Sequence, residues 1–250
     1  MKIFKRIIAY LIDIVLVISI STLISNNSYI NKDYNKYKKT YKEYEEKYTA
    51  YEDFISDIEK KYKDETLNEK EIKELVNTYP SYKKYFSDIK EIDKDNYEEF
   101  IGKINDDFKD TQEDYSYKLS KYSIIPGIIR IMSFLLYFVV IQFYVGNTLG
   151  KKIMKLKVVP NGNKKLNILN YFVRSLIVNE VFVNILNIIF MLILSKNNFI
   201  IYSNIMYVIT YAIEVSIIFM MAFTKDNRGL HDYAAQTRVV EIKGEKDHEV

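Results

Sequence analysis

The sequence contains no cysteine, which excludes disulfide bonds and metal sites built from thiolates. It has two histidines, His231 and His248, so a histidine-rich metal site is excluded as well. Neither a nucleophile paired with a base nor a cluster of metal-ligating residues is recognisable. The sequence therefore predicts a protein that is not an enzyme, holds no cofactor or metal and binds no nucleic acid.

Charged and apolar residues are unevenly distributed along the chain. The mean hydropathy of −0.15 is typical of a soluble protein. However, residues 26–121 hold 19 lysines against 24 acidic residues, a net charge of −5. The rest of the chain carries +8, which brings the total to +3, and contains long apolar runs. A water-soluble segment is therefore inserted into an apolar, basic-flanked protein.

Four apolar stretches are long enough to cross the ~30 Å hydrocarbon core of a bilayer as helices. They are residues 7–24, 123–145, 168–194 and 199–223. The basic start of the chain resembles a signal peptide, but no small-x-small cleavage site follows, and Asp13 lies within the apolar run. We therefore expect a retained first helix.

Basic residues indicate the orientation of these spans. They precede the first span and fill the 146–167 loop, and Lys225, Arg228 and Arg238 follow the fourth, whereas the link at Lys196 is almost uncharged. The positive-inside rule then places both termini in the cytoplasm, with the protein in the cytoplasmic membrane. The predicted organisation is a first membrane helix at 1–25, an extracytoplasmic helical insertion at 26–121, the other three spans with cytoplasmic motifs at 122–242, and a flexible tail at 243–250.

Aromatic and apolar residues recur at alternating spacings of three and four in the first part of the insertion. Nine such positions predict a long helix with a tyrosine-rich seam, as in a coiled coil. The seam consists of Tyr34, Tyr37, Tyr41, Tyr44, Tyr48, Tyr51, Ile55, Ile58 and Tyr62. Capping boxes that begin at Thr66 and Asp95 predict further helices. The insertion is either a spacer or binds another protein or a second copy through residues 30–62.

Four short motifs occur in the apolar part. They are Arg-x-x-Ala-x-x-x-Asp at 6–13, Gly-Asn-Thr-Leu-Gly-Lys at 146–151, Asn-Tyr-Phe-Val-Arg-Ser-Leu at 170–176 and Arg-Gly-Leu-His-Asp-Tyr-Ala-Ala at 228–235. In this order they resemble the RDD family of bacterial membrane proteins, over residues 1–25 and 122–242. The arginine and two aspartates that name the family correspond to Arg6, Asp13 and Asp232. The resemblance implies a transport role, and some members look like cation/proton antiporters.

Two charged residues lie at matching depth in the first and third spans. Asp13 and Arg174 are each six residues inside their helix, roughly 9 Å from the same membrane surface. A lone charge at that depth is costly, and a guanidinium grips a carboxylate well. We therefore predict an ion pair between them, with Arg6, on the same helix face as Asp13, at the interface.

Further polar residues lie deeper in the third and fourth spans. Two interpretations remain open: buried polar contacts that fix helix packing, or a path in which Asp13, Glu180 and Glu214 exchange a proton or bind a cation. The candidate residues are Arg174, Glu180, Asn184, Asn187 and Glu214.

The glycine motif after the second span does not match a phosphate-binding loop, because its spacing is one residue short and a helix precedes it. We interpret it as the end of the span followed by a basic amphipathic turn, with the lysines of residues 146–165 at anionic lipid headgroups. Its candidate residues are Gly146, Thr148, Gly150 and Lys151.

The C-terminal motif contains His231 and Asp232 beside Arg228. This dyad either handles a proton or is structural, with Asp232 capping a turn or binding Arg228. Residues 155–159 and 237–242 read as strands and are expected to pair as a small cytoplasmic sheet.

The expected fold is an all-α membrane protein with four transmembrane helices, a helical insertion between the first two and a small strand pairing. Two functions fit this fold. One is transport of a small ligand or a cation/proton through a polar intramembrane path. The alternative is a non-catalytic envelope protein that binds or senses a partner through the insertion.

Overall fold

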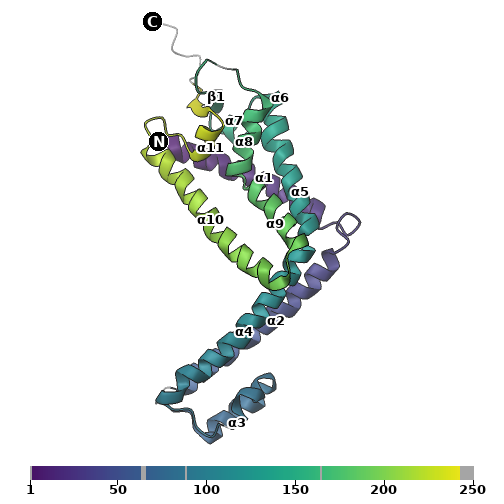
Figure 1. Cartoon of the computed structure of the whole chain (residues 1–250), viewed down its shortest axis with the longest axis vertical. Helices are drawn as coiled ribbons and strands as arrows, with labels where there is room; N and C mark the ends of the chain where they lie inside the picture. Colours follow the sequence, from purple (N-terminus) through teal and green to yellow (C-terminus); the bar gives the residue numbers. More distant parts are fainter. Residues whose placement is uncertain (1, 63–65, 88, 164, 243–250) are drawn as a thin grey trace. The chain divides into compact units, whose positions relative to one another are not determined.

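The computed structural model describes residues 2–62, 66–87, 89–163 and 165–242 (Figure 1). Lys164 of the predicted lipid-facing loop and the predicted tail at 243–250 lie outside these described residues. The chain divides into two compact units. We call residues up to 34 and from 121 onward the membrane unit, and residues 35–120 the insertion unit.

The membrane unit is built from helices and one pair of strands. Its elements are α1 (Lys2–Ser25), α5 (Ile124–Leu135), the π-helical turn η3 (Leu136–Ile141), α6 (Gln142–Val145), α7 (Leu149–Ile153), β1 (Leu156–Pro160), α8 (Ile168–Val178), α9 (Val181–Ile193), α10 (Lys196–Phe223), α11 (Leu230–Ala234) and β2 (Thr237–Glu241). Elements α5, η3 and α6 follow one another without a break and form one continuous helix.

Within the described residues, three helices are long and apolar enough to cross a membrane: Ile3–Ser25, Ile124–Val145 and Lys196–Phe223. Helices α8 and α9 together pass the same test and make a fourth span if the bent pair is counted as one. Large apolar side chains such as Leu23, Leu192 and Phe223 are mostly exposed on these helices. Such a surface suits contact with lipid.

The third predicted span is not the continuous helix that we expected. Helix α8 ends at Val178 and α9 begins at Val181, at an angle of 64°. Between them Glu180 adopts a left-handed conformation with φ of 52°, in which a right-handed helix cannot continue. The Tyr10 hydroxyl donates to the Val178 carbonyl at 2.8 Å, and the Asn184 amide donates to the Glu180 carbonyl at 2.9 Å. Carbonyls at the break thus find partners away from water.

The predicted pairing of two short strands is confirmed. Strands β1 and β2 are antiparallel, with Leu156 opposite Glu241 and Pro160 opposite Thr237. Lys5 near the start of α1 binds Glu241, and the N-terminus lies beside α11 and the strands (Figure 1). We call this part of the membrane unit the sheet end.

The insertion unit is helical, with α2 (Tyr34–Lys61), α3 (Glu69–Thr78), the 3-10 helix η2 (Pro80–Phe86) and α4 (Lys94–Tyr122). Ring contacts from Tyr44 to Tyr115, from Tyr51 to Phe108 and from Tyr62 onto α4 show that α2 and α4 are antiparallel. Much of the tyrosine seam therefore packs on α4 of the same chain. The core of the unit consists of Phe54, Ile58, Leu67, Ile72, Leu75, Phe86, Ile92, Phe100 and Ile104.

Both predicted capping boxes are displaced by two residues. The side chain of Asn68, not Thr66, caps α3 and accepts hydrogen bonds from the next residues, while Glu71 bonds back to it. At the start of α4, Asp93 plays this role in place of Asp95. Asn and Asp cap helices at least as well as Thr. The observed and the predicted boxes overlap in the sequence, and both have the four-residue spacing of a capping box.

Candidate functional site

Three residues on one face of α1 join this helix to the rest of the sheet end. Arg6, Ala9 and Asp13 are spaced by three and four residues, so they point the same way. Ala9 is buried against Gly150, where an added Cβ would lie 2.0 Å from the Ala9 carbonyl oxygen. This close approach places the start of α7 against Asp13.

The fully buried carboxylate of Asp13 accepts three hydrogen bonds. The Thr148 hydroxyl donates at 2.5 Å, the Gly150 amide at 2.7 Å and the Tyr137 hydroxyl at 2.7 Å. The ammonium group of Lys151 lies 3.9 Å away. The glycine motif therefore forms a shell of donors around Asp13, as a buried carboxylate needs.

The predicted ion pair between Asp13 and Arg174 is wrong, because Arg174 binds Asp232 instead. Equal depth in two helices did not imply contact: α7 folds back over Asp13 and occupies the space that the pairing would need. Gly146 makes this return possible, since its φ of 84° ends α6 in a conformation that favours glycine.

Asp232 forms the centre of a second buried cluster. One carboxylate oxygen accepts from Arg6, and the other accepts from Arg174. The Thr237 hydroxyl, which Arg174 also contacts at 2.8 Å, donates to Asp232 at 3.3 Å, as does the Gly229 amide. The cluster connects α1, α8, α11 and β2, which are far apart in the sequence.

The charges in this cluster control the protonation of Asp232. Burial alone raises the pKa of a carboxyl group, but the nearby cations, foremost Arg174, outweigh it and hold the pKa of Asp232 well below its ordinary value. Asp232 is therefore ionised at neutral pH. Arg228 contacts it through the backbone, since its guanidinium donates to the carbonyls of Asp232 and Thr237 and stacks on Tyr233.

His231 is buried next to this cluster. Its Nε2 lies 3.5 Å from Asp232, while its Nδ1 has no hydrogen-bond partner in the described part of the chain. Burial lowers the pKa of His231 to about 3, and Arg174 adds to the effect. The imidazole is therefore neutral near pH 7.

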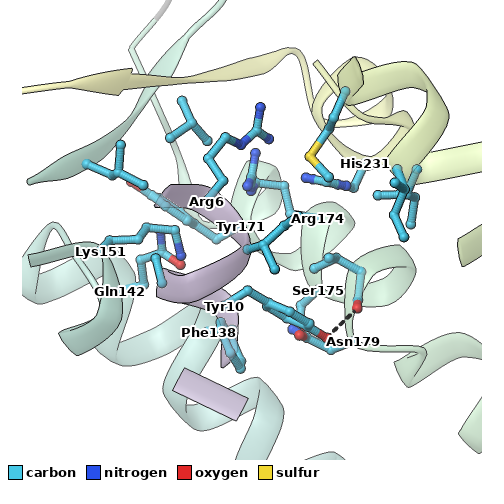
Figure 2. A pocket seen from close by; sticks show the side chains of 18 of the residues that line it. Arg6, Tyr10, Phe138, Gln142, Lys151, Tyr171, Arg174, Ser175, Asn179 and His231 are labelled. Atoms are coloured by element: carbon cyan, nitrogen blue, oxygen red, sulfur yellow. Dashed lines mark hydrogen bonds between the residues drawn. The ribbon is translucent and has the colours of Figure 1, made fainter. Parts of the chain in front are cut away.

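A cavity of about 350 Å³ lies between these two clusters and α10. Figure 2 shows Arg6, Arg174 and His231 on one side of it, with Lys151 and Gln142 also at its wall and Tyr10 and Asn179 farther along. Apolar side chains complete the wall, among them Phe138, Tyr171, Ile217 and Met221.

The buried position of Lys151 differs from its predicted place at lipid headgroups. Its side chain lines the cavity and lies over the ring of Phe138, with the ammonium 5.7 Å from the ring centre. Burial lowers the pKa of Lys151 to about 7, and Arg174 lowers it further than Asp13 raises it. Lys152, Lys155, Lys157 and Lys165 are exposed among the described lysines of this segment.

Compared with known families, the chain matches the RDD family over residues 100–236, more than half of its length. The chain belongs to the RDD family. Comparison with curated proteins and with solved structures found no match.

The RDD match contains most of the cluster residues but not α1. Gly146–Lys151, Arg174 and Asp232 lie inside the matched segment, whereas Arg6 and Asp13 precede it. The structure nevertheless binds Arg6 to Asp232, and Asp13 to the glycine motif. The first-helix motif is thus joined to the RDD segment by direct contacts.

The deeper polar candidates divide into separate contacts. The carboxyl groups of Glu180 and of Glu214 in α10 lie close to each other, and Glu214 also lines the cavity. Asn184 binds the Glu180 carbonyl, and Asn187 accepts from the Tyr202 hydroxyl at 3.1 Å.

Several contact residues escaped the sequence analysis. Tyr137 bonds Asp13, Tyr10 bonds the helix break, and Gln142 and Asn179 line the cavity. A lone amide such as Gln142 in an otherwise apolar run was a usable signal, because buried amides in a span require partners. The two tyrosines gave no such signal, since tyrosine is common throughout this chain.

We expect the stability of the protein to fall as the pH is lowered from 6.5 toward 3. His231 has a depressed pKa when folded and an ordinary one, about 6.5, when unfolded, so the unfolded state binds more protons in this window. The slope should approach about 1.4 kcal/mol per pH unit. Thermal unfolding in detergent between pH 5 and 7.5 measures it, above the range in which Asp232 contributes.

The control for this slope is His231→Asn. The groups that face His231 are Asp232 on its own helix, Arg174 on α8, Arg6 on α1 and Lys151 on α7. Between pH 5 and 6.5 the pKa of Asp232 lies well below the window and that of Lys151, about 7, lies above it, so the variant should lose most of the slope there. A variant with an unchanged slope would show that His231 is protonated in the folded state.

Proposed function

We propose that this RDD protein carries a small solute across the membrane through the cavity at its sheet end, and does not transform it chemically. The observation that carries the proposal is a cavity inside the membrane unit that is lined by cationic groups and by the carboxyl group of Glu214, which lies close to Glu180. Ionisable residues at membrane depth are costly and usually mark a ligand or proton pathway.

The carboxyl pair is the proposed proton-exchanging element. Glu214 lines the cavity and lies close to Glu180, so loss or gain of one proton by the pair would change the charge at the cavity wall. Asp13 is left out of this role, because three donors fix its carboxylate away from the pair. Its role in the proposal is to hold α7 in place.

The proposal predicts a pH-gradient-driven flux that depends on the pair. With the full chain in liposomes, Glu214→Gln and Glu180→Gln should each lower the flux at least about tenfold, a size expected for loss of a proton-transfer group. A pH-sensitive dye would report it, with sodium, potassium and a set of organic solutes as probes. The exposed Glu98→Gln should transport like the wild type.

Two results would contradict transport. One is a flux no greater than that of empty liposomes for every probe solute. The other is equal flux through the wild type and both variants, with folded yields matched by size-exclusion chromatography. Asp13→Asn is unsuitable for this comparison, because it removes an acceptor from a buried shell and changes the fold.

We also propose that both termini and the sheet end face the cytoplasm of a bacterial cell, with the insertion unit outside. The basic residues of the 146–167 loop support this orientation, and the exposed lysines Lys152, Lys155 and Lys157 would contact anionic headgroups.

The absence of cysteine makes this orientation directly testable. Single cysteines at exposed positions of the two units, Glu98→Cys and Lys157→Cys, differ in access to a membrane-impermeant maleimide. On intact spheroplasts the first should label and the second should label only after permeabilisation. The reverse pattern would invert the topology.

A second candidate function, partner binding by the insertion unit, rests on the part of the seam that α4 leaves open. Tyr37 and Tyr41 are stacked, and Tyr41 is exposed. A photo-crosslinker at Tyr41 in intact cells would capture a protein partner or a second copy. If a crosslinker at the neighbouring exposed Lys38 gives the same products, the tyrosines are not the contact.

A further inference from the structure

The walls of the cavity carry more positive than negative charge. Arg6 and Arg174 share one carboxylate, Asp232. Among the described residues, the guanidinium of the neighbouring Arg228 donates hydrogen bonds to backbone carbonyls only. Lys151 faces Asp13, whose carboxylate already accepts three nearer donors. Four buried or half-buried cations thus share two carboxylates. Among the described residues that line the cavity, Arg6, Lys151 and Arg174 are cationic and Glu214 is the acidic one, so positive groups outnumber negative ones at the wall.

Unsatisfied polar atoms point to the same place. Four buried side-chain atoms have no hydrogen-bond partner among the described residues, and three belong to cavity-lining residues: Gln142, Asn179 and His231. All three side chains are more than nine-tenths buried. Native proteins nearly always pair such groups with protein, water or ligand. Gln142 offers an N–H donor, and exchange of the Asn179 amide atoms would free a second one, since Ser175 can donate as well as accept.

The remaining wall is apolar and the volume is limited. Phe138, Tyr171, Ile217 and Met221 present ring and aliphatic surface. A volume of about 350 Å³ accommodates roughly a dozen non-hydrogen atoms, since one water occupies about 30 Å³ in the liquid. A bare inorganic ion would leave most of this apolar wall uncovered.

We propose that the cavity binds a small organic anion, a carboxylate or phosphate ester whose charged oxygens face Lys151, Arg174 and Gln142 and whose apolar body covers the aromatic and aliphatic wall. This inference names the class of solute for the transport proposal. It rests on that proposal only for the statement that the anion crosses the membrane. A free metabolite and a lipid with an anionic headgroup share this chemistry. The lowered pKa of Lys151 is consistent with a site that lacks its counter-anion.

Equilibrium binding to the full chain in an uncharged maltoside detergent tests the inference. Octanoate, octanol and octylammonium have nearly the same apolar body and differ in charge. Octanoate should bind at least about tenfold more tightly than either, as expected for charge-assisted hydrogen bonds. Equal binding of all three probes, or tighter binding of octylammonium, would overturn the proposal.

Two variants locate the anion within the cavity. Lys151→Met and Gln142→Met should each weaken octanoate binding about tenfold, whereas the exposed neighbour Lys152→Met should not. Gln142→Met keeps the side-chain length and removes an unpartnered donor, so its melting temperature should not fall. Weak binding in a stable Gln142→Met protein therefore supports the site. Unchanged octanoate affinity in both cavity variants would refute it.

Native mass spectrometry distinguishes the two sources of the anion. Phosphatidylglycerol that copurifies and is displaced by octanoate assigns the site to a lipid, and octanoate binding without displacement assigns it to a free solute. Failure of this inference is separable from failure of the transport proposal. If octanoate binds but no flux is measured, the anion site is supported and transport is refuted. If other solutes are transported but octanoate does not bind, only the anion site is refuted.

Discussion

Asp232→Asn should destabilise the membrane unit by about 3–5 kcal/mol, the usual cost of removing one partner from a buried ion pair. Asp232 is fully buried and is the shared carboxylate of Arg6 and Arg174. An asparagine of nearly the same shape leaves two buried guanidinium groups without a counter-charge. We expect a large loss of folded yield in membranes and a lower melting temperature in detergent.

The matched control is Asp226→Asn, which removes an exposed carboxylate from the preceding loop and should have little effect. Adding Arg6→Gln to Asp232→Asn should recover part of the loss, because one uncompensated charge is then removed as well. Strictly additive losses in the double variant would argue against a shared carboxylate, and so would a folded yield of Asp232→Asn equal to that of Asp226→Asn.

Gly150→Ala should disrupt the packing of α7 on α1. An added Cβ would lie 2.0 Å from the Ala9 carbonyl oxygen and 3.0 Å from the Asp13 carboxyl carbon, and the first is a backbone atom that cannot turn aside. The helices must move apart, which breaks the hydrogen bond from the Gly150 amide to Asp13. Close helix crossings in membranes depend on such small residues. We expect a loss of several kcal/mol, as for other overpacked buried sites combined with a broken polar contact.

Gly102→Ala provides the opposite control. Nothing lies within 4 Å of a Cβ at Gly102, which is inside helix α4 of the insertion unit. Alanine there should raise stability by up to about 1 kcal/mol, because it favours the helix. Thermal unfolding and folded yield of the two variants, measured side by side, test both expectations. A Gly150→Ala protein as stable as the wild type would show that α1 and α7 are farther apart than described here.

The composition of the sequence and the spacing of its residues were sufficient to predict the coarse features of this protein. Runs of 18 or more apolar residues predict membrane helices because the bilayer imposes a length, and the helices Ile3–Ser25, Ile124–Val145 and Lys196–Phe223 follow those runs. The strand pair was predictable from two short β-type segments beside strong turn residues, and its register is regular. The motifs also indicated membership of the RDD family. These features depend on local composition, which a sequence contains directly.

The choice of partners for each charge was decided only by the tertiary structure. Depth along a helix places Asp13 and Arg174 at similar levels, but the crossing of α7 over α1 encloses the first, and α11 brings Asp232 to the second. The bend at Glu180 likewise depends on a left-handed residue whose freed carbonyls are satisfied by Tyr10 and by the next helix turn. A helical repeat specifies which side chains share a face of one helix. It does not specify which segment covers that face, because that depends on contacts between residues far apart in the sequence.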